Sequence, residues 1–505
     1  MGFRPRVPVA AVAVLLAGAA CTGEPAQPPG ATQSPRPLPT SFGGEPPPGV
    51  AGAPSRFLHG PGSDGPDILD DPMGVRIQAV GDAFLISSNS EERHVLQDAA
   101  DGATLWEGGH RVDGFGTDRD GSDVLVLTGD DGTTTVVGDD GEAVWSGDGG
   151  RDSYVGGVVV RRPEGWSADD PYGDFTVRGT DGAEIWDFAF TPPPGADPGD
   201  SGDPDGRGDG EGNGSEEGDT EPPLFGDPDA PSAAPDPDRL GVPVGAHGDA
   251  LLLTDGSGLF QARDIGDDTG ELLWSVAGDD PALAGDSGVP LPQPQIVGYY
   301  DLPGTGDGPE ATAAGEPEDA PASGEPDGGA PEARPTVLLR WSFPEDPSLL
   351  SLHDLDDGAT LWTLTEPGAN PVDREFTPAQ VTGTVYDPAT GTLLLPQASG
   401  AASLIAVDLA TGAQRWEFED ADERSIVPAV ALSGYVYGDS RSADDTESSQ
   451  VVLEAETKDV VADDLDSYVE AATGDGHVLV VRDRQRFVFP PPGDPAPGVS
   501  ASPTR

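Results

Sequence analysis

The sequence predicts an all-β protein, a β-propeller of about seven four-stranded sheets, or blades, with eight as the alternative. Three observations lead to this fold class. A glycine–tryptophan pair recurs along the chain, short β-prone segments bounded by Gly or Asp precede it, and no segment has the period of an amphipathic helix. A single four-stranded sheet cannot bury both faces, so repeats of this kind stack against their neighbours.

The recurring pair sets the period. Six tryptophans each follow a glycine by four residues, and the residue before each glycine is Asp or Thr. The pairs are Gly102/Trp106, Gly141/Trp145, Gly182/Trp186, Gly270/Trp274, Gly358/Trp362 and Gly412/Trp416. Successive tryptophans are 39, 41, 88, 88 and 54 residues apart. The two long intervals contain polar insertions, and without them the unit is about 40 to 55 residues, the length of one blade.

Each pair has a physical explanation. Asp-Gly or Thr-Gly makes a tight turn between two strands, and its glycine adopts the positive φ that other residues resist. The next strand then carries a tryptophan, which we expect to pack between neighbouring blades. The regular spacing favours this core role over a ligand-binding platform. Trp166 and Trp341 fall outside the register and are the candidates for an exposed aromatic.

The strands expected before these turns are rich in Val, Leu, Ile and Phe. They are 83–86, 124–127, 154–160, 250–253, 392–395 and 477–481. A further, degenerate copy is expected at 452–458, where glycine and tryptophan are missing and Lys458, the only lysine of the chain, ends the segment.

The most complete copy of the unit resembles a known repeat. Residues 404–416, with the sequence LIAVDLATGAQRW, resemble the repeat of the pyrroloquinoline-quinone-like (quinoprotein-type) propellers, and 350–362 is a close second copy. The resemblance implies an all-β propeller, often of eight blades. Quinone-dependent dehydrogenases of this family hold a tricarboxylate quinone with cationic side chains and calcium, often beside adjacent cysteines. Because this chain has one cysteine and few arginines among many acids, we expect neither that cofactor nor that activity.

Composition and the N-terminus predict an exported protein. The formal net charge of −65 disfavours binding to nucleic acid and to anionic lipid. Two arginines and an apolar run over residues 1–20 predict a signal peptide, too short to span a bilayer as a mature helix. Cys21, the sole cysteine, follows Gly18-Ala19-Ala20 and resembles the lipobox of bacterial lipoproteins, in which the cysteine is lipidated, although that family usually has Leu at the position of Gly18. The alternative is ordinary secretory cleavage.

Pro, Gly and acidic residues divide the mature chain. We expect a disordered tether at 21–54, the propeller at 55–489 with disordered acidic insertions at about 191–238 and 304–334, and a disordered tail at 490–505. Abundant Ala, Gly, Asp and Pro with a single lysine suggest a genome of high G+C content, as in actinobacteria.

The sequence contains few candidates for chemistry. Asp118, Asp120 and Asp123 surround a glycine turn with the hard oxygen ligands that suit calcium, but do not complete a twelve-residue calcium loop. The alternative is that Asp and Gly are simply what propeller turns contain. The six histidines match no catalytic motif, and we expect His353 to be structural. We expect Asp98, Asp354 and Asp408, which precede turns, to accept backbone N–H groups. No catalytic or cofactor-binding residue is predicted.

These observations predict a lipid-anchored scaffold on the outer face of the cell membrane that binds a protein or glycan and is not an enzyme. In anchoring and fold it is similar to the lipoprotein scaffold of outer-membrane protein assembly. Two alternatives stay open: an extracytoplasmic sensor or solute-binding module for a sugar or divalent cation, and a quinone-dependent dehydrogenase.

Overall fold

The computed structural model describes residues 41–58, 67–192, 238–267, 269–284, 291, 294–303, 333–343, 345–371, 376, 383–400, 402–418, 425–440 and 450–493. These residues belong to one compact unit, 39–505. The predicted signal peptide, Cys21, nearly all of both acidic insertions and most of the predicted tail lie outside the described residues.

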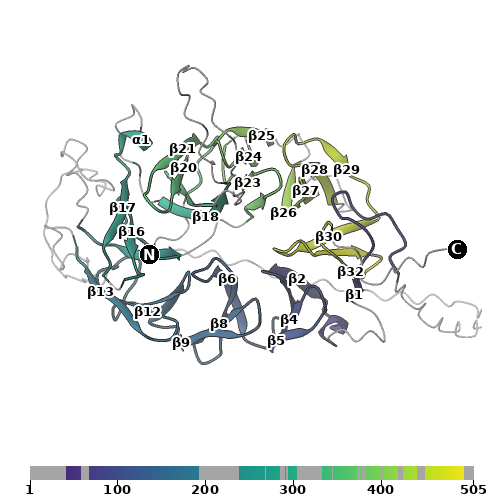
Figure 1. The fold of residues 1–505 in the computed structure, drawn as a ribbon, viewed down its shortest axis with the longest axis horizontal. Coiled ribbons are helices and arrows are strands. Elements are labelled where there is room, and N and C mark those ends of the chain that lie inside the picture. Colours follow the sequence, from purple (N-terminus) through teal and green to yellow (C-terminus); the bar gives the residue numbers. More distant parts are fainter. Residues whose placement is uncertain are drawn as a thin grey trace, which may run out of the picture. The chain divides into compact units, whose positions relative to one another are not determined.

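Eight four-stranded antiparallel sheets make up the fold, and seven of them are formed by strands that follow one another in the chain (Figure 1). We number them as blades 1 to 8. Blades 1 to 4 consist of β2 (Val75–Val80), β3 (Ala83–Ser88), β4 (His94–Asp98) and β5 (Thr104–Gly108); β6 (Arg111–Thr117), β7 (Asp123–Thr128), β8 (Thr133–Gly138) and β9 (Ala143–Asp148); β10 (Asp152–Val155), β11 (Val158–Arg161), β12 (Gly173–Gly179) and β13 (Glu184–Phe190); and β14 (Val242–His247), β15 (Ala250–Thr254), β16 (Leu259–Asp264) and β17 (Leu272–Ala277).

Blades 5 to 7 consist of β18 (Pro294–Leu302), β19 (Arg334–Trp341), β20 (Leu349–Asp354) and β21 (Thr360–Thr365); β22 (Val385–Asp387), β23 (Thr392–Pro396), β24 (Leu404–Asp408) and β25 (Gln414–Phe418); and β26 (Ile426–Leu432), β27 (Tyr435–Ser440), β28 (Gln450–Glu454) and β29 (Val460–Ala462). Blade 8 combines β30 (Ser467–Ala472), β31 (Val478–Arg482) and β32 (Gln485–Phe489) with the N-terminal β1 (Arg56–Phe57). Two short helices, η1 (Asp67–Asp70) and α1 (Pro281–Ala284), complete the described elements.

Eight hydrophobic clusters show that the ring is closed. Each cluster combines buried side chains of two consecutive blades, and one of them joins blade 8 to blade 1 through residues such as Leu479, Val488 and Phe84. The structure therefore has eight blades, the alternative to the predicted number of about seven. No helix among the described residues is long and apolar enough to cross a membrane.

The predicted glycine–tryptophan pairs join neighbouring blades. The indole Nε1 of Trp274 donates to Leu355 O of the next blade at 2.7 Å, and Trp362 and Trp416 repeat this bond to Leu409 O and Ala455 O at 2.8 Å. For Trp186, Trp274 and Trp362 the repeat glycine of the next blade lies on the indole ring, as Gly358 does on Trp274, whereas Gly141 and Gly182 do not contact a tryptophan in this way. The predicted interblade role of these tryptophans is confirmed.

Two departures from the repeat occur in blades 7 and 8. Lys458 takes the glycine position in blade 7 with φ of +67°, which confirms the degenerate copy. At the closure, Arg56 of β1 takes the place of a tryptophan. Its Nη2 donates to Asp98 O at 2.9 Å and Ala99 O at 3.0 Å, three residues before Gly102, and its Nη1 donates to Gln97 Oε1 at 3.0 Å.

Two predicted boundaries were wrong. The strand expected at 154–160 is two strands, β10 and β11, because Gly156 and Gly157 both have positive φ and form a turn. The tether expected at 21–54 extends too far, because residues 41–54 pack on blades 7 and 8. Phe42 contacts the rings of Phe487 and Phe489 at centroid distances of 5.3 and 5.2 Å, and Val50 is buried.

Candidate binding site in the central channel

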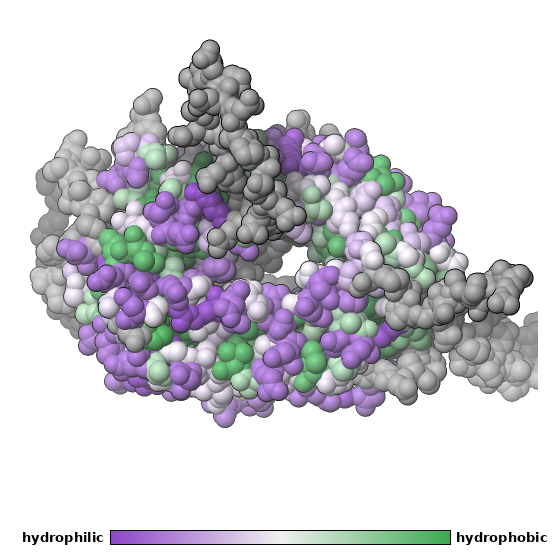
Figure 2. Space-filling model, viewed as in Figure 1, coloured by the Kyte–Doolittle hydropathy of each residue, from purple (hydrophilic) through white to green (hydrophobic). Residues whose placement is uncertain are grey.

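The first strand of each blade lines a central channel, and Figure 2 shows an opening near the middle of this face. In β6, β26 and β30 more exposed residues alternate with more buried ones, as expected where one face of a strand packs on the blade and the other faces solvent. Phe115 of β6, Val427 of β26 and Tyr468 of β30 are 40%, 39% and 43% exposed. The channel is therefore not filled by side chains along these strands.

Two adjoining pockets lie on the side of the channel formed by blades 2 to 6. The first, about 320 Å³ in volume, is lined mainly by β6, β10, β14 and β18. The second, about 450 Å³ in volume, is lined by the ends of β6, β14, β18 and β22, and we call it the channel mouth. Thr117 and Tyr299 line both pockets, so the two are continuous.

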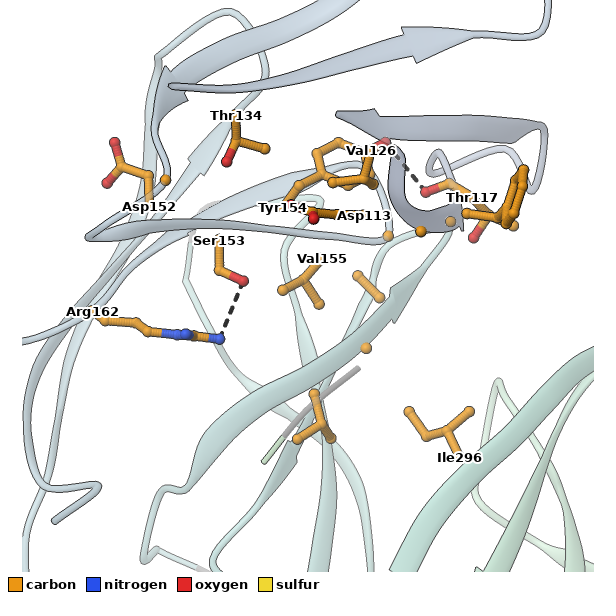
Figure 3. Close-up of a pocket in the computed structure, with 18 of the residues that line it drawn as sticks. Asp113, Thr117, Val126, Thr134, Asp152, Ser153, Tyr154, Val155, Arg162 and Ile296 are labelled. Atoms are coloured by element: carbon orange, nitrogen blue, oxygen red, sulfur yellow. Dashed lines mark hydrogen bonds between the residues drawn. The ribbon is translucent and has the colours of Figure 1, made fainter. Parts of the chain in front are cut away.

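In the first pocket, most polar groups have partners (Figure 3). Arg162 Nη2 donates to Ser153 Oγ at 3.2 Å, and the Tyr154 hydroxyl donates to Thr117 O at 3.2 Å. Asp152 forms a two-pronged ion pair with Arg161, with N–O distances of 2.7 and 2.8 Å. Asp113 is paired with Arg111. The carboxylates of this pocket are thus already balanced by arginines.

The channel mouth is different. Its twelve lining residues include Asp120, Asp123 and Asp301, from three separate positions in the chain. None of the twelve is Lys or Arg, and none of the three aspartates forms an ion pair within the described structure. The mouth therefore holds three negative charges without a local counter-charge.

A latch between blades 2 and 4 holds one side of the mouth. Arg119, in the turn after β6, donates from Nε to Gly248 O at 2.9 Å and pairs with Asp249, while Gly248 N donates to Arg119 O at 2.8 Å. The turn of blade 3 lies between these loops. Side chains at Gly156 and Gly157 would overlap the backbones of Ala246 and Arg119, so only glycine leaves room for the latch.

Aromatic rings form the rest of the wall. The rings of His247 and Tyr299 stack at 5.0 Å with an interplanar angle of 16°, and those of Tyr300 and Tyr386 meet edge to face at 5.2 Å. The consecutive Tyr299 and Tyr300 lie on opposite faces of β18, as strand neighbours do, with Tyr299 packed against the cluster of blades 4 and 5 and Tyr300 against that of blades 5 and 6. Both nevertheless line the mouth, one on each side of β18.

Three buried polar atoms in this wall have no hydrogen-bond partner. They are Nδ1 of His247, the hydroxyl of Tyr299 and Oγ1 of Thr384. Buried polar groups normally have partners, and an unpartnered one costs about 1–3 kcal/mol. Three such atoms lining one pocket indicate a place prepared for a ligand or for ordered water.

The histidine and the tyrosines of the mouth add no charge of their own. Burial lowers the pKa of His247 below its ordinary value, against the opposing effect of Asp301 and Asp118, so the imidazole is neutral at neutral pH. Burial also raises the pKa values of Tyr299 and Tyr300, which keeps both phenols neutral. Burial, together with the nearby Asp82 and Asp118, raises the pKa of Asp123, while a bond from Gly81 N lowers it.

The candidate calcium ligands are not gathered into one site. Asp118 Oδ1 accepts from the backbone N of Asp120 and of Ser122, both at 2.9 Å, and Asp123 Oδ2 accepts from Gly81 N at 2.8 Å. Within the described part of the chain, no group of three or more His, Cys, Asp or Glu is arranged to hold a metal ion. Asp118 serves the turn, whereas Asp120 and Asp123 face the channel mouth.

The histidines that contact serines lie inside blades. His353 is fully buried, with Nε2 2.7 Å from Ser351 Oγ and Nδ1 3.2 Å from Gly358 O, which confirms its structural role. His94 lies 2.8 Å from Ser87 Oγ and is likewise buried. Neither pair lines the channel pockets.

The aspartates before turns behave as predicted. Asp98, Asp354 and Asp408 each accept a backbone N–H two or three residues later, at 2.8, 2.8 and 3.0 Å. The prediction for Trp341 was wrong: it is fully buried and its Nε1 donates to Ser351 Oγ at 2.8 Å. Trp166 is half-buried beneath the Arg162 guanidinium, whose Cζ lies 4.2 Å from the centroid of the tryptophan ring.

The mouth residues other than Asp120 and Asp123 were missed by the sequence analysis. The one local signal was the sequence Gly298-Tyr299-Tyr300-Asp301, an aromatic and acidic run after a glycine in a first strand. His247 and Tyr386 carry no signal of their own, because only ring closure brings them to the same pocket.

Comparison with solved structures finds propellers of several kinds. The chain is similar to BamB from Moraxella catarrhalis (13% identity, TM-score 0.38, covering 84% of this chain and 96% of that one) and to the quinohemoprotein alcohol dehydrogenase ADHIIG from Pseudomonas putida HK5 (13%, 0.37, 79% and 68%). It is also similar to Sqt1 from Chaetomium thermophilum, solved bound to the N-terminus of the ribosomal protein L10 (10%, 0.37, 82% and 96%). No protein-family model and no curated protein matches the sequence. The eight sheets themselves define the class: an eight-bladed β-propeller with quinoprotein-like repeats.

Proposed function

We propose that this protein is an exported, lipid-anchored β-propeller that binds a protein partner at the cell envelope through its channel mouth and performs no catalysis. The observation that carries the proposal is the mouth itself. It combines three carboxylates without a counter-charge and three buried polar atoms without a partner. A site with these unmet interactions gains free energy when a ligand supplies them.

The charge of the channel supports binding of something other than a quinone. Five aspartates and one arginine line the two pockets: Asp113, Asp120, Asp123, Asp152, Asp301 and Arg162. A tricarboxylate would be repelled by this lining, because most of its charged groups carry the same sign as the ligand. The residues present therefore do not fit the quinone cofactor.

The anchor is proposed from the sequence alone. Cys21 lies outside the described residues, and the support is its position at the end of the apolar run. Metabolic labelling with a radioactive or clickable fatty acid should mark the wild-type protein and fail to mark Cys21→Ser. Labelling that survives the substitution would remove the anchor from the proposal.

Partner binding is tested with full-length protein crosslinked on intact cells. Asp301→Arg reverses a charge at the mouth, and Asp187→Arg makes the same change on β13, the outer strand of blade 3. Asp187 is exposed and lines neither pocket. We expect one protein to be captured by the wild type and by Asp187→Arg but lost with Asp301→Arg. Equal capture by both variants, or turnover of a substrate by the pure protein, would refute the proposal.

The pocket volumes favour one second candidate. At about 320 and 450 Å³, both lie within the range of small-molecule sites, which supports the alternative of a solute-binding module. A thermal-shift screen with calcium and with oligosaccharides separates the two functions. A saturable shift that Asp301→Arg abolishes would favour the solute-binding module, and a scaffold predicts none.

A further inference from the structure

We infer that the channel mouth receives a positively charged side chain, the ammonium of Lys or the guanidinium of Arg, from an extended segment of the partner protein. The inference rests on the proposed function and specifies the chemistry of its partner. Three features of the mouth carry it: its unbalanced charge, its unpartnered polar atoms and its aromatic wall.

Charge decides the sign of the ligand. Asp120, Asp123 and Asp301 line one pocket that has no Lys or Arg among its lining residues. The nearest arginine in the sequence, Arg119, is already committed to Gly248 and Asp249. The neutral His247 supplies no compensation. The free pocket thus holds like charges together, and a ligand cation relieves that repulsion as well as forming ion pairs.

Hydrogen bonding decides that the cation is organic. An ammonium carries three N–H donors and a guanidinium five, and neither can accept. The mouth offers matching acceptors in its carboxylates, in the Tyr299 hydroxyl and in Thr384 Oγ1, both of which are buried without a partner. A bare metal ion fits less well, because no group of three or more candidate ligands is arranged for one among the described residues.

The tyrosines suit the same ligand. Cations bind favourably over aromatic faces, by about 0.5–1 kcal/mol at exposed sites and more when water is excluded. Tyr299, Tyr300 and Tyr386 all line the mouth, and their hydroxyl-bearing rings combine apolar surface with polar edges. The aliphatic part of a Lys or Arg side chain packs on such surface while its charged end reaches the carboxylates.

The shape of the site favours a segment of protein over a free amine. The mouth continues into the first pocket past Thr117 and Tyr299, and the carboxylates there are already paired. An extended chain can place one cationic side chain in the mouth and a neutral part in the neighbouring pocket. The chain's own insertion at 304–332 contains acidic residues and no Lys or Arg, so its charge is wrong for this site.

Fluorescence anisotropy with the full mature chain tests the inference. The probe is a fluorescein-labelled peptide of alternating Gly and Arg, and the matched probe replaces Arg with Gln. Salt is held at about 0.15 M, where charges more than about 8 Å apart are largely screened. We expect saturable binding of the Arg probe and none of the Gln probe.

A matched pair of triple variants separates the mouth from the general negative field. The mouth variant is Asp120→Asn, Asp123→Asn and Asp301→Asn. The control changes Asp174→Asn, Glu184→Gln and Asp187→Asn on β12 and β13, where all three residues are exposed. We expect the mouth variant to weaken binding at least about tenfold and the control less than about twofold, because only the mouth variant removes carboxylates that can pair with the bound cation. Equal weakening would show attraction by the overall charge and overturn the inference.

Tyr299→Phe supplies a second readout. It removes a buried hydroxyl that has no partner, so we expect an unchanged or raised unfolding midpoint together with weaker binding of the Arg probe. Unchanged affinity would overturn the role of this hydroxyl. Displacement of the probe by spermidine at a lower concentration than by unlabelled peptide would point to a free amine and overturn the assignment to a protein segment.

The inference and the proposed function fail separately. If the mouth triple variant binds the Arg probe unchanged yet no longer captures the envelope partner, the cationic ligand is wrong and the function stands. If it loses the probe but captures the partner as before, the partner binds elsewhere and the proposed function fails.

Discussion

Gly358→Ala tests directly how neighbouring blades are joined. Gly358 has φ of +71°, and an added Cβ would lie 2.7 Å from Cδ2 and from Cγ of Trp274 in the preceding blade. Gly182 occupies the same turn of the repeat in blade 3 with φ of +85°, and a Cβ there would meet nothing within 4 Å. The two substitutions therefore share the backbone strain and differ in the contact across the blade boundary.

The expected magnitudes follow from these contacts. Placing Ala at positive φ costs about 1–2 kcal/mol, which is the whole effect expected for Gly182→Ala. In Gly358→Ala the indole must also move away, and overpacking of this kind costs about 1–3 kcal/mol. Movement of the ring also strains the 2.7 Å bond from Trp274 Nε1 to Leu355 O. We expect a total loss of about 2–5 kcal/mol.

Equilibrium urea unfolding followed by circular dichroism measures both losses on the same scale. The difference between Gly358→Ala and Gly182→Ala reports the interblade contact, because the backbone strain cancels. A difference of about 1 kcal/mol or more supports the packing described here. Equal losses would mean that the indole does not hold the blades together as proposed.

Two further predictions concern ring closure and pH. Arg56→Ala removes three hydrogen bonds between β1 and blade 1, so it should lower the free energy of unfolding by about 2–4 kcal/mol and speed hydrogen exchange in β32. The control Arg76→Ala breaks only an exposed ion pair and should cost less than about 1 kcal/mol. Equal hydrogen exchange in the two variants would refute the role of Arg56 in closing the ring. Burial lowers the pKa of His353 to about 4 from its ordinary 6.5. As pH falls, the imidazole of the unfolded chain is therefore protonated before that of the folded chain, and the folded state loses stability between pH 6.5 and 4. Relative to His353→Gln, the wild type should lose about 3 kcal/mol over that range in urea unfolding, and parallel pH profiles would contradict the assignment.

The blade was predictable from sequence because its information is local. A glycine with positive φ and a tryptophan four residues later lie in one hairpin, so each copy of the repeat can be recognised from its own residues alone. The same reasoning missed the closing blade's link to blade 1, since Arg56 replaces the tryptophan and its partners at 97–99 belong to another blade. It also extended the tether too far, because Phe42 and Val50 are isolated apolar residues whose partners lie more than 380 residues away in the sequence.

The channel mouth was decided by the tertiary structure. Its walls come from strands of blades 2, 4, 5 and 6, and blade 2 is separated from blade 4 by blade 3 both in the sequence and in the ring. The latch of Arg119 over Gly156–Gly157 brings two of these together, and Tyr299 and Tyr300 line the mouth from opposite faces of β18. The sequence by itself determined the repeating sheet, because strand, turn and indole are set by neighbours along the chain. Closing eight sheets into a ring determined the site, because only closure brings distant first strands to a common channel.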